Sequence, residues 1–133
     1  MCMAVYLATS QPLPKADRSP LTVEAAEAET SERLRKHLVL PHVYFVASHE
    51  GCGCGFILDH EEGTDEECML REASLEALRD LVREVSGRGN AEVLVTFDGE
   101  EAVEPEHSRT LESLDDLVVK WGDRTLWCVP AKS

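Results

Sequence analysis

Two cysteines and a histidine lie close together in a glycine-rich stretch, and these residue types are the ones best suited to chemistry in this chain. The stretch reads Ser-His-Glu-Gly-Cys-Gly-Cys-Gly-Phe over residues 48–56, so that glycine stands before, between and after Cys52 and Cys54. In an extended segment, residues two apart point to the same side, which would bring both sulfurs to one face. His49 lies three residues before the first thiol and would add an imidazole.

Thiolates and imidazoles together are typical ligands of a soft or borderline cation, and Zn²⁺ takes four of them in a tetrahedral arrangement. The sequence therefore predicts a zinc-like metal site, with zinc as its cofactor. The candidate ligands are Cys52, Cys54, His49, His60 and Cys68. The single residue between the two cysteines differs from the roughly two to four residues of common zinc fingers, so the pattern indicates the chemistry and not a particular finger.

Two other interpretations of the stretch stay open. In the first, Cys52 or Cys54 is a redox or transferring thiol with His49 as its base, and the protein is an enzyme. A reactive thiolate needs nearby positive charge, yet there is no lysine or arginine between His37 and Leu70, so the local charge favours a bound cation. In the second, the glycines form a tight turn that contacts a partner, and the chain is a non-catalytic interaction module.

The net charge of the chain indicates which classes of partner to expect. The 26 acidic and 13 basic residues give a net charge of −13. Nucleic acids and anionic membranes attract basic surfaces, so we expect neither of them as a partner. An acidic surface suits a metal ion or a basic protein instead. The oligomeric state is not indicated by these features.

The cysteine usage and the N-terminus favour a cytoplasmic location. An odd number of irregularly spaced cysteines is typical of free thiols or metal ligands in a reducing compartment. No segment approaches the roughly 18 apolar residues of a transmembrane helix. The apolar start has no basic residues before it, as a signal peptide would. Cys2 and Cys128 are expected in terminal strands, buried in the core.

The hydrophobic pattern predicts an α/β or α+β fold, with residues 1–133 forming a single domain. We expect a mixed sheet of four to five strands, two main helices and a short third helix. Residues 21–29 are ambiguous between strand and helix, and we assign a strand followed by a short helix capped by Thr30 or Ser31. The other strands are expected at residues 2–8, 42–48, 91–97 and 124–129, and a further short helix near residues 111–118.

The segment at residues 42–48 is the strongest strand, because four apolar residues run through it without a break. Such a run is typical of a central strand covered on both faces. The glycine-cysteine stretch follows at its C-terminal end, where open α/β sheets collect ligands.

A long helix follows the glycine-cysteine stretch. Thr64 and Glu67 have the spacing of a capping box, and Gly87 is a natural stop after about Ser86. The connection from residues 42–48 through this helix to residues 91–97 is long enough for a right-handed parallel βαβ unit, and an antiparallel α+β arrangement is the alternative. The stripe expected to face the core consists of Cys68, Leu75, Leu78, Val82 and Val85.

Overall fold

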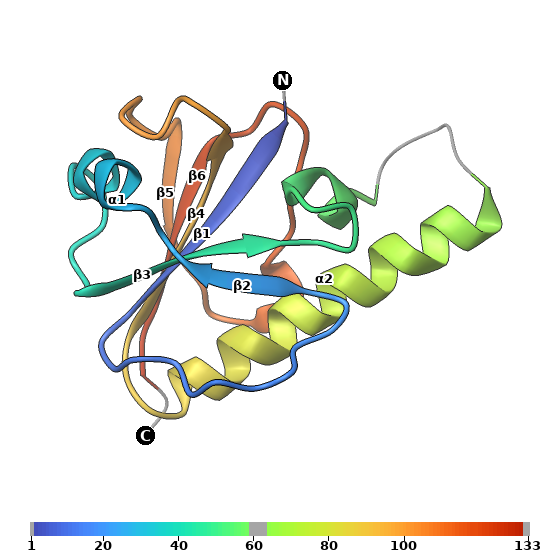
Figure 1. Ribbon diagram of the computed structural model, residues 1–133, viewed down its shortest axis with the longest axis horizontal. Helices are drawn as coiled ribbons and strands as arrows, with labels where there is room; N and C mark the ends of the chain where they lie inside the picture. The colour runs from blue at the N-terminus through green and yellow to red at the C-terminus, as the bar shows by residue number, and fades with distance from the viewer. Residues whose placement is uncertain (1, 59–63, 132–133) are drawn as a thin grey trace.

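The computed structural model describes residues 2–58 and 64–131, which form one six-stranded mixed sheet with a helix on each face (Figure 1). The strand order is β2-β3-β1-β4-β6-β5, and neighbouring strands are antiparallel except for the parallel pair of β5 and β6. In chain order, the elements are β1 (Met3–Thr9), β2 (Thr22–Ala25), α1 (Ala28–Leu34), β3 (His42–Ala47), the 3₁₀ turn η1 (Gly53–Phe56), α2 (Asp65–Ser86), β4 (Ala91–Phe97), β5 (His107–Thr110), the 3₁₀ turn η2 (Leu114–Asp116) and β6 (Thr125–Val129).

The N-terminal strand β1 is the centre of the sheet. All seven of its residues are buried, and it pairs with β3 on one side and β4 on the other. Because side chains alternate along a strand, β1 contributes to two cores. The α2 face takes Met3, Val5 and Leu7, and the α1 face takes Ala4, Tyr6 and Ala8.

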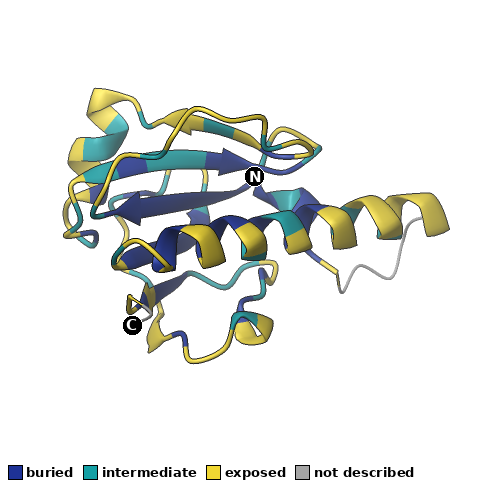
Figure 2. Cartoon of the chain, turned by 90° about the horizontal axis from the view of Figure 1, so that it is seen from below, coloured by how far each residue is buried: buried dark blue, intermediate teal, exposed yellow. Residues whose placement is uncertain are grey.

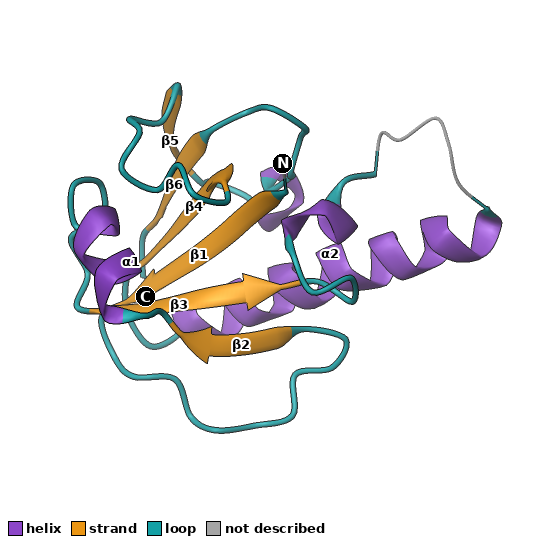
Figure 3. Cartoon of the chain, turned by 45° about the horizontal axis from the view of Figure 1, so that its top comes forward, coloured by secondary structure: helices purple, strands orange, loops and turns teal. Residues whose placement is uncertain are grey.

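Helix α2 covers one face of the sheet and α1 lies across the other (Figure 3). The buried side of α2 forms one stripe, while its outer side is exposed along its whole length (Figure 2). Cys68, at the first turns, is only half-buried, so the stripe is confirmed from Leu75 onward. Although α2 is long, no helix within the described part of the chain is apolar enough to cross a membrane.

The sheet confirms the α+β alternative and corrects the parallel βαβ unit. Strands β3 and β4 are both antiparallel to β1 and therefore point the same way, but β1 lies between them. The expectation that residues 42–48 form a central strand covered on both faces is confirmed in part: Val46 lies in the α2 core and Val43 in the α1 core, but the cover is incomplete. Tyr44 and Phe45 of β3 are half-buried, because the strand beside them, β2, is short and mostly exposed.

Three further expectations differ from the structure. The sheet has six strands among the described residues, because β5 is a short strand whose four residues are all exposed and whose sequence carries no hydrophobic pattern. The helix expected near residues 111–118 is absent, and the only helical segment there is the 3₁₀ turn η2. The apolar side chains that suggested a helix, Leu111 and Leu117, are instead buried in the core from a loop. Helix α1 begins at Ala28, before Thr30 and Ser31, and has no side-chain cap.

The stripe of α2 predicts a large loss of stability on truncation. Leu78 is 0% exposed and packs in the core between α2 and β1, so Leu78→Ala should lower the free energy of unfolding by about 2–5 kcal/mol. Met69 lies on the same helix but is 69% exposed, so Met69→Ala is the matched control and should change stability by less than about 0.5 kcal/mol. Urea melts of both variants give the comparison, and equal midpoints would contradict the assigned packing of α2.

The start of α2 predicts a smaller effect. The side-chain oxygen of Thr64 accepts a hydrogen bond from the backbone N–H of Glu67 at 3.2 Å, as the capping box requires. Thr64→Ala leaves that N–H without its acceptor and should cost about 0.5–2 kcal/mol. Thr64→Ser keeps the hydroxyl and should stay near the wild type in thermal melts, so a serine variant as unstable as the alanine variant would argue against the cap.

Candidate metal centre

Three cysteine sulfurs, those of Cys2, Cys52 and Cys54, lie within 4.8 Å of one another. Cys2 immediately precedes β1 and is exposed, while the other two are half-buried in the turn that follows β3. The beginning of β1 and this turn lie next to each other (Figures 1 and 3). Within residues 2–58 and 64–131, no other group of three histidine, cysteine or acidic side chains comes close enough to share a metal ion.

The turn between β3 and η1 is built around Ser48. Its backbone N–H and its hydroxyl both donate to the carbonyl oxygen of Cys52, at 2.9 and 2.6 Å, and its own carbonyl accepts from the N–H of Gly51 at 2.9 Å. Gly51 has a φ of +83°, a backbone conformation that glycine adopts without steric cost. These bonds reverse the chain directly after β3 and carry Cys52 and Cys54 back toward β1.

The glycines after the turn allow close backbone packing. A Cβ on Gly53 would lie 2.8 Å from the carbonyl oxygen of Met3, closer than real Cβ atoms come. A Cβ on Gly55 would lie 2.7 Å from the Cβ of Ser48 and 3.0 Å from the ring of His49. The tight turn that the glycines indicated is present. The extended conformation assumed for this backbone is wrong, because Gly53 begins the turn η1.

Cys2 is the residue that sequence reasoning missed. It is exposed and not in the core, and so is Cys128 in β6. Met3 pairs with Phe97 at the end of β4, and the carbonyl of Cys2 accepts a hydrogen bond from the N–H of Asp98 at 2.8 Å. The β1–β4 ladder therefore fixes Cys2. This strand pairing brings Cys2 to the turn. The sequence could not predict it, because a cysteine one residue before a strand does not indicate which distant segment it will meet.

The remaining predicted ligands lie outside the three-sulfur group or outside the described residues. The Nδ1 atom of His49 is 2.7 Å from the hydroxyl oxygen of Ser74 on α2, and the same hydroxyl accepts from the backbone N–H of His49 at 3.2 Å. Cys68 is half-buried in the first turns of α2 and does not belong to the group. His60 is not among the described residues. Their part in a metal site stays a prediction.

The electrostatics around the sulfurs keep Cys52 protonated at neutral pH. Burial raises the pKa of Cys52 from 9.0 to about 12. The backbone N–H of Cys54 acts in the opposite direction, but the side chain of Cys54 raises the pKa further through its hydrogen bond and its charge. A neutral thiol is a poor nucleophile. A metal cation that displaces the proton would reverse this, because a coordinated thiol is deprotonated.

Comparison of the sequence with family models, and of the chain with curated proteins and solved structures, found no match. The function must therefore be inferred from the chemistry of this chain's own residues. The arrangement of the three sulfurs is the most specific chemistry in the part of the chain that the structure describes.

The contact between the turn and β1 can be tested at a single atom. Gly53→Ala places a methyl group against the carbonyl of Met3 and should lower the free energy of unfolding by about 1–3 kcal/mol. Gly87→Ala at the end of α2 is the control, because its added Cβ would come no closer than 3.4 Å to a neighbour. Urea melts compare the two, and a Gly53→Ala variant no less stable than Gly87→Ala would mean that the turn and β1 are not in contact.

Proposed function

We propose that the protein binds a soft or borderline metal cation, zinc-like in its preferences, through Cys2, Cys52 and Cys54. The observation that carries the proposal is the convergence of three sulfurs within 4.8 Å from two separate segments of the chain. Thiolates favour Zn²⁺ or Cu⁺ over Mg²⁺ and Ca²⁺, which prefer oxygen ligands. The net charge of −13 adds a general attraction for cations.

The surroundings of the sulfurs suit a bound cation. The backbone N–H of Met3 points to the sulfur of Cys54 at 3.4 Å, and such N–H donors stabilise a coordinated thiolate. Ser74 engages Nδ1 of His49, so a fourth ligand from this residue would have to be its other ring nitrogen, and the ring would have to move toward the three sulfurs to supply it. Water is the alternative in that position. A metal held by three thiolates would tie the beginning of β1 to the turn after β3, which is a structural role.

The thiol-enzyme alternative is less well supported. It requires a cysteine with a lowered pKa, and burial acts in the opposite direction at Cys52. Because three thiols this close can also be oxidised to a disulfide, the metal experiment must be made on reduced protein.

The proposal predicts which cysteines matter. In calorimetric titrations of reduced, metal-free protein with Zn²⁺, Cys2→Ser should weaken binding by at least about tenfold, and the double change of Cys52 and Cys54 to serine should abolish it. Cys128→Ser is the matched control, because that thiol is exposed on β6 outside the group, and it should bind like the wild type. Cys68→Ser, measured beside them, tests the more distant candidate ligand.

The affinity should also rise with pH between about 6 and 8. Each thiol gives up its proton on binding, so binding releases protons and strengthens as the proton concentration falls. If wild type and double variant bind Zn²⁺ equally, the acidic surface holds the ion and the three thiols do not. Rapid iodoacetamide labelling of Cys52 at neutral pH in metal-free protein would favour the thiol enzyme instead.

A further inference from the structure

A second feature of the molecule lies apart from the cysteines, in a groove between the β5–β6 edge of the sheet and the loop of residues 111–123. Its volume is about 390 Å³, and none of the three clustered cysteines lines it. Sites for small molecules commonly enclose about 300–1,000 Å³, so the groove is large enough for a ligand of a few to about a dozen heavy atoms.

The side chains of two neighbouring strands form the floor of the groove. Val95 of β4 and Trp127 of β6 line it, and Trp127 is paired with Arg109 of β5 in the sheet register. The residue Trp127 is only 8% exposed, and its indole N–H has no acceptor among the described residues. The indole nitrogen itself is covered by protein atoms, so a ligand in the groove meets the ring of Trp127 and not its N–H.

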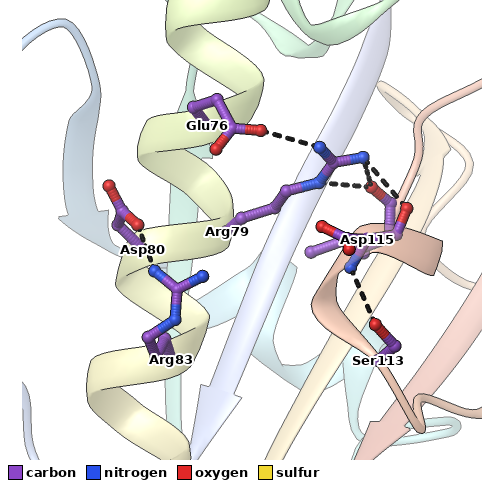
Figure 4. Close-up of polar contacts among 7 residues, drawn as sticks. Glu76, Arg79, Asp80, Arg83, Ser113 and Asp115 are labelled. Atoms are coloured by element: carbon purple, nitrogen blue, oxygen red, sulfur yellow. Dashed lines mark hydrogen bonds and ion pairs between the residues drawn. The ribbon is translucent and has the colours of Figure 1, made fainter.

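The wall of the groove is anchored to α2. The guanidinium of Arg79 donates to the carbonyl of Leu117 at 3.1 and 3.0 Å and to the carbonyl of Asp115 at 3.2 Å (Figure 4). Glu76 accepts from the same guanidinium at 2.7 Å and orients it. Because one side chain holds two carbonyls of the loop, the groove is formed before any ligand arrives.

Charged groups of both signs line the groove. Arg109 and Lys120 are basic, Glu112, Asp116 and Asp123 are acidic, and none of the five makes an ion pair with a described residue. A dianion would be repelled by the three carboxylates, and a dication would be repelled by the arginine and the lysine. A molecule that carries one charge of each sign has a partner for both.

We propose that this groove binds a small zwitterion, an amino acid or dipeptide in size, independently of the metal site. Arg109 and Lys120 contact its carboxylate, since a guanidinium pairs well with a carboxylate. The acidic residues Glu112, Asp116 and Asp123 contact its ammonium group. The ring of Trp127 and the side chain of Val95 contact its apolar part.

The test uses Trp127 as the reporter. The chain has two tryptophans, and Trp121→Phe removes the other one while keeping an aromatic ring against Phe97. This variant is titrated with leucine, glutamine and the dipeptide glycyl-leucine, each beside its N-acetylated and its amidated derivative. The zwitterions should change the emission of Trp127, and each capped derivative, having lost one charge, should bind at least about fivefold more weakly.

Substitutions then assign the contacts by calorimetry. Arg109→Met should weaken zwitterion binding by at least about fivefold, because the carboxylate of the ligand loses its guanidinium partner. Arg83→Met is the matched control, because Arg83 points outward on α2 to Asp80 and has no part in the groove (Figure 4). Circular dichroism confirms that each variant is folded. Equal binding of free and capped ligands, equal effects of Arg109→Met and Arg83→Met, or no response to any probe at millimolar concentration would each overturn the proposal.

Discussion

The burial of β1 on both faces is the constraint on which the rest of the structure depends. Every residue of this strand is buried, both of its edges are paired, and its alternate side chains enter the cores under α2 and α1. Among the six described strands, β1 is the one whose residues are all buried, although β4 comes close with six of seven. The β2–β3 half and the β4–β6–β5 half of the sheet are therefore joined through β1.

The candidate metal centre follows from the same strand. The first residues of β1 are fixed by β4, and the turn after β3 reaches them because Gly53 has no side chain to keep the two backbones apart. Three sulfurs thus converge without any basic residue between His37 and Leu70 to balance thiolate charge. Burial raises the pKa of the Cys52 thiol, which therefore keeps its proton until a cation replaces it, and this links the packing of glycine to the proposed preference for a metal.

The opposite edge of the sheet has a different character. Strand β5 is short, polar and exposed, and the loop beyond it is held by hydrogen bonds from Arg79 and by the burial of Leu111 and Leu117. Charged side chains on this edge lower the risk of pairing with another chain. They also surround the groove over Trp127, so the features that protect the edge supply the charges of the proposed ligand site.

The sequence by itself determined the features that arise from local signals. The cap at Thr64, the buried stripe from Leu75 onward, the strands near residues 91–97 and 124–129, and the close packing of the glycines all follow from residue type and spacing over a few positions. Only the tertiary structure decided that β1 lies between β3 and β4, that polar residues form β5, and that Cys2 joins Cys52 and Cys54. The pairing of strands far apart in the chain makes those choices, and no short pattern of residues carries that information.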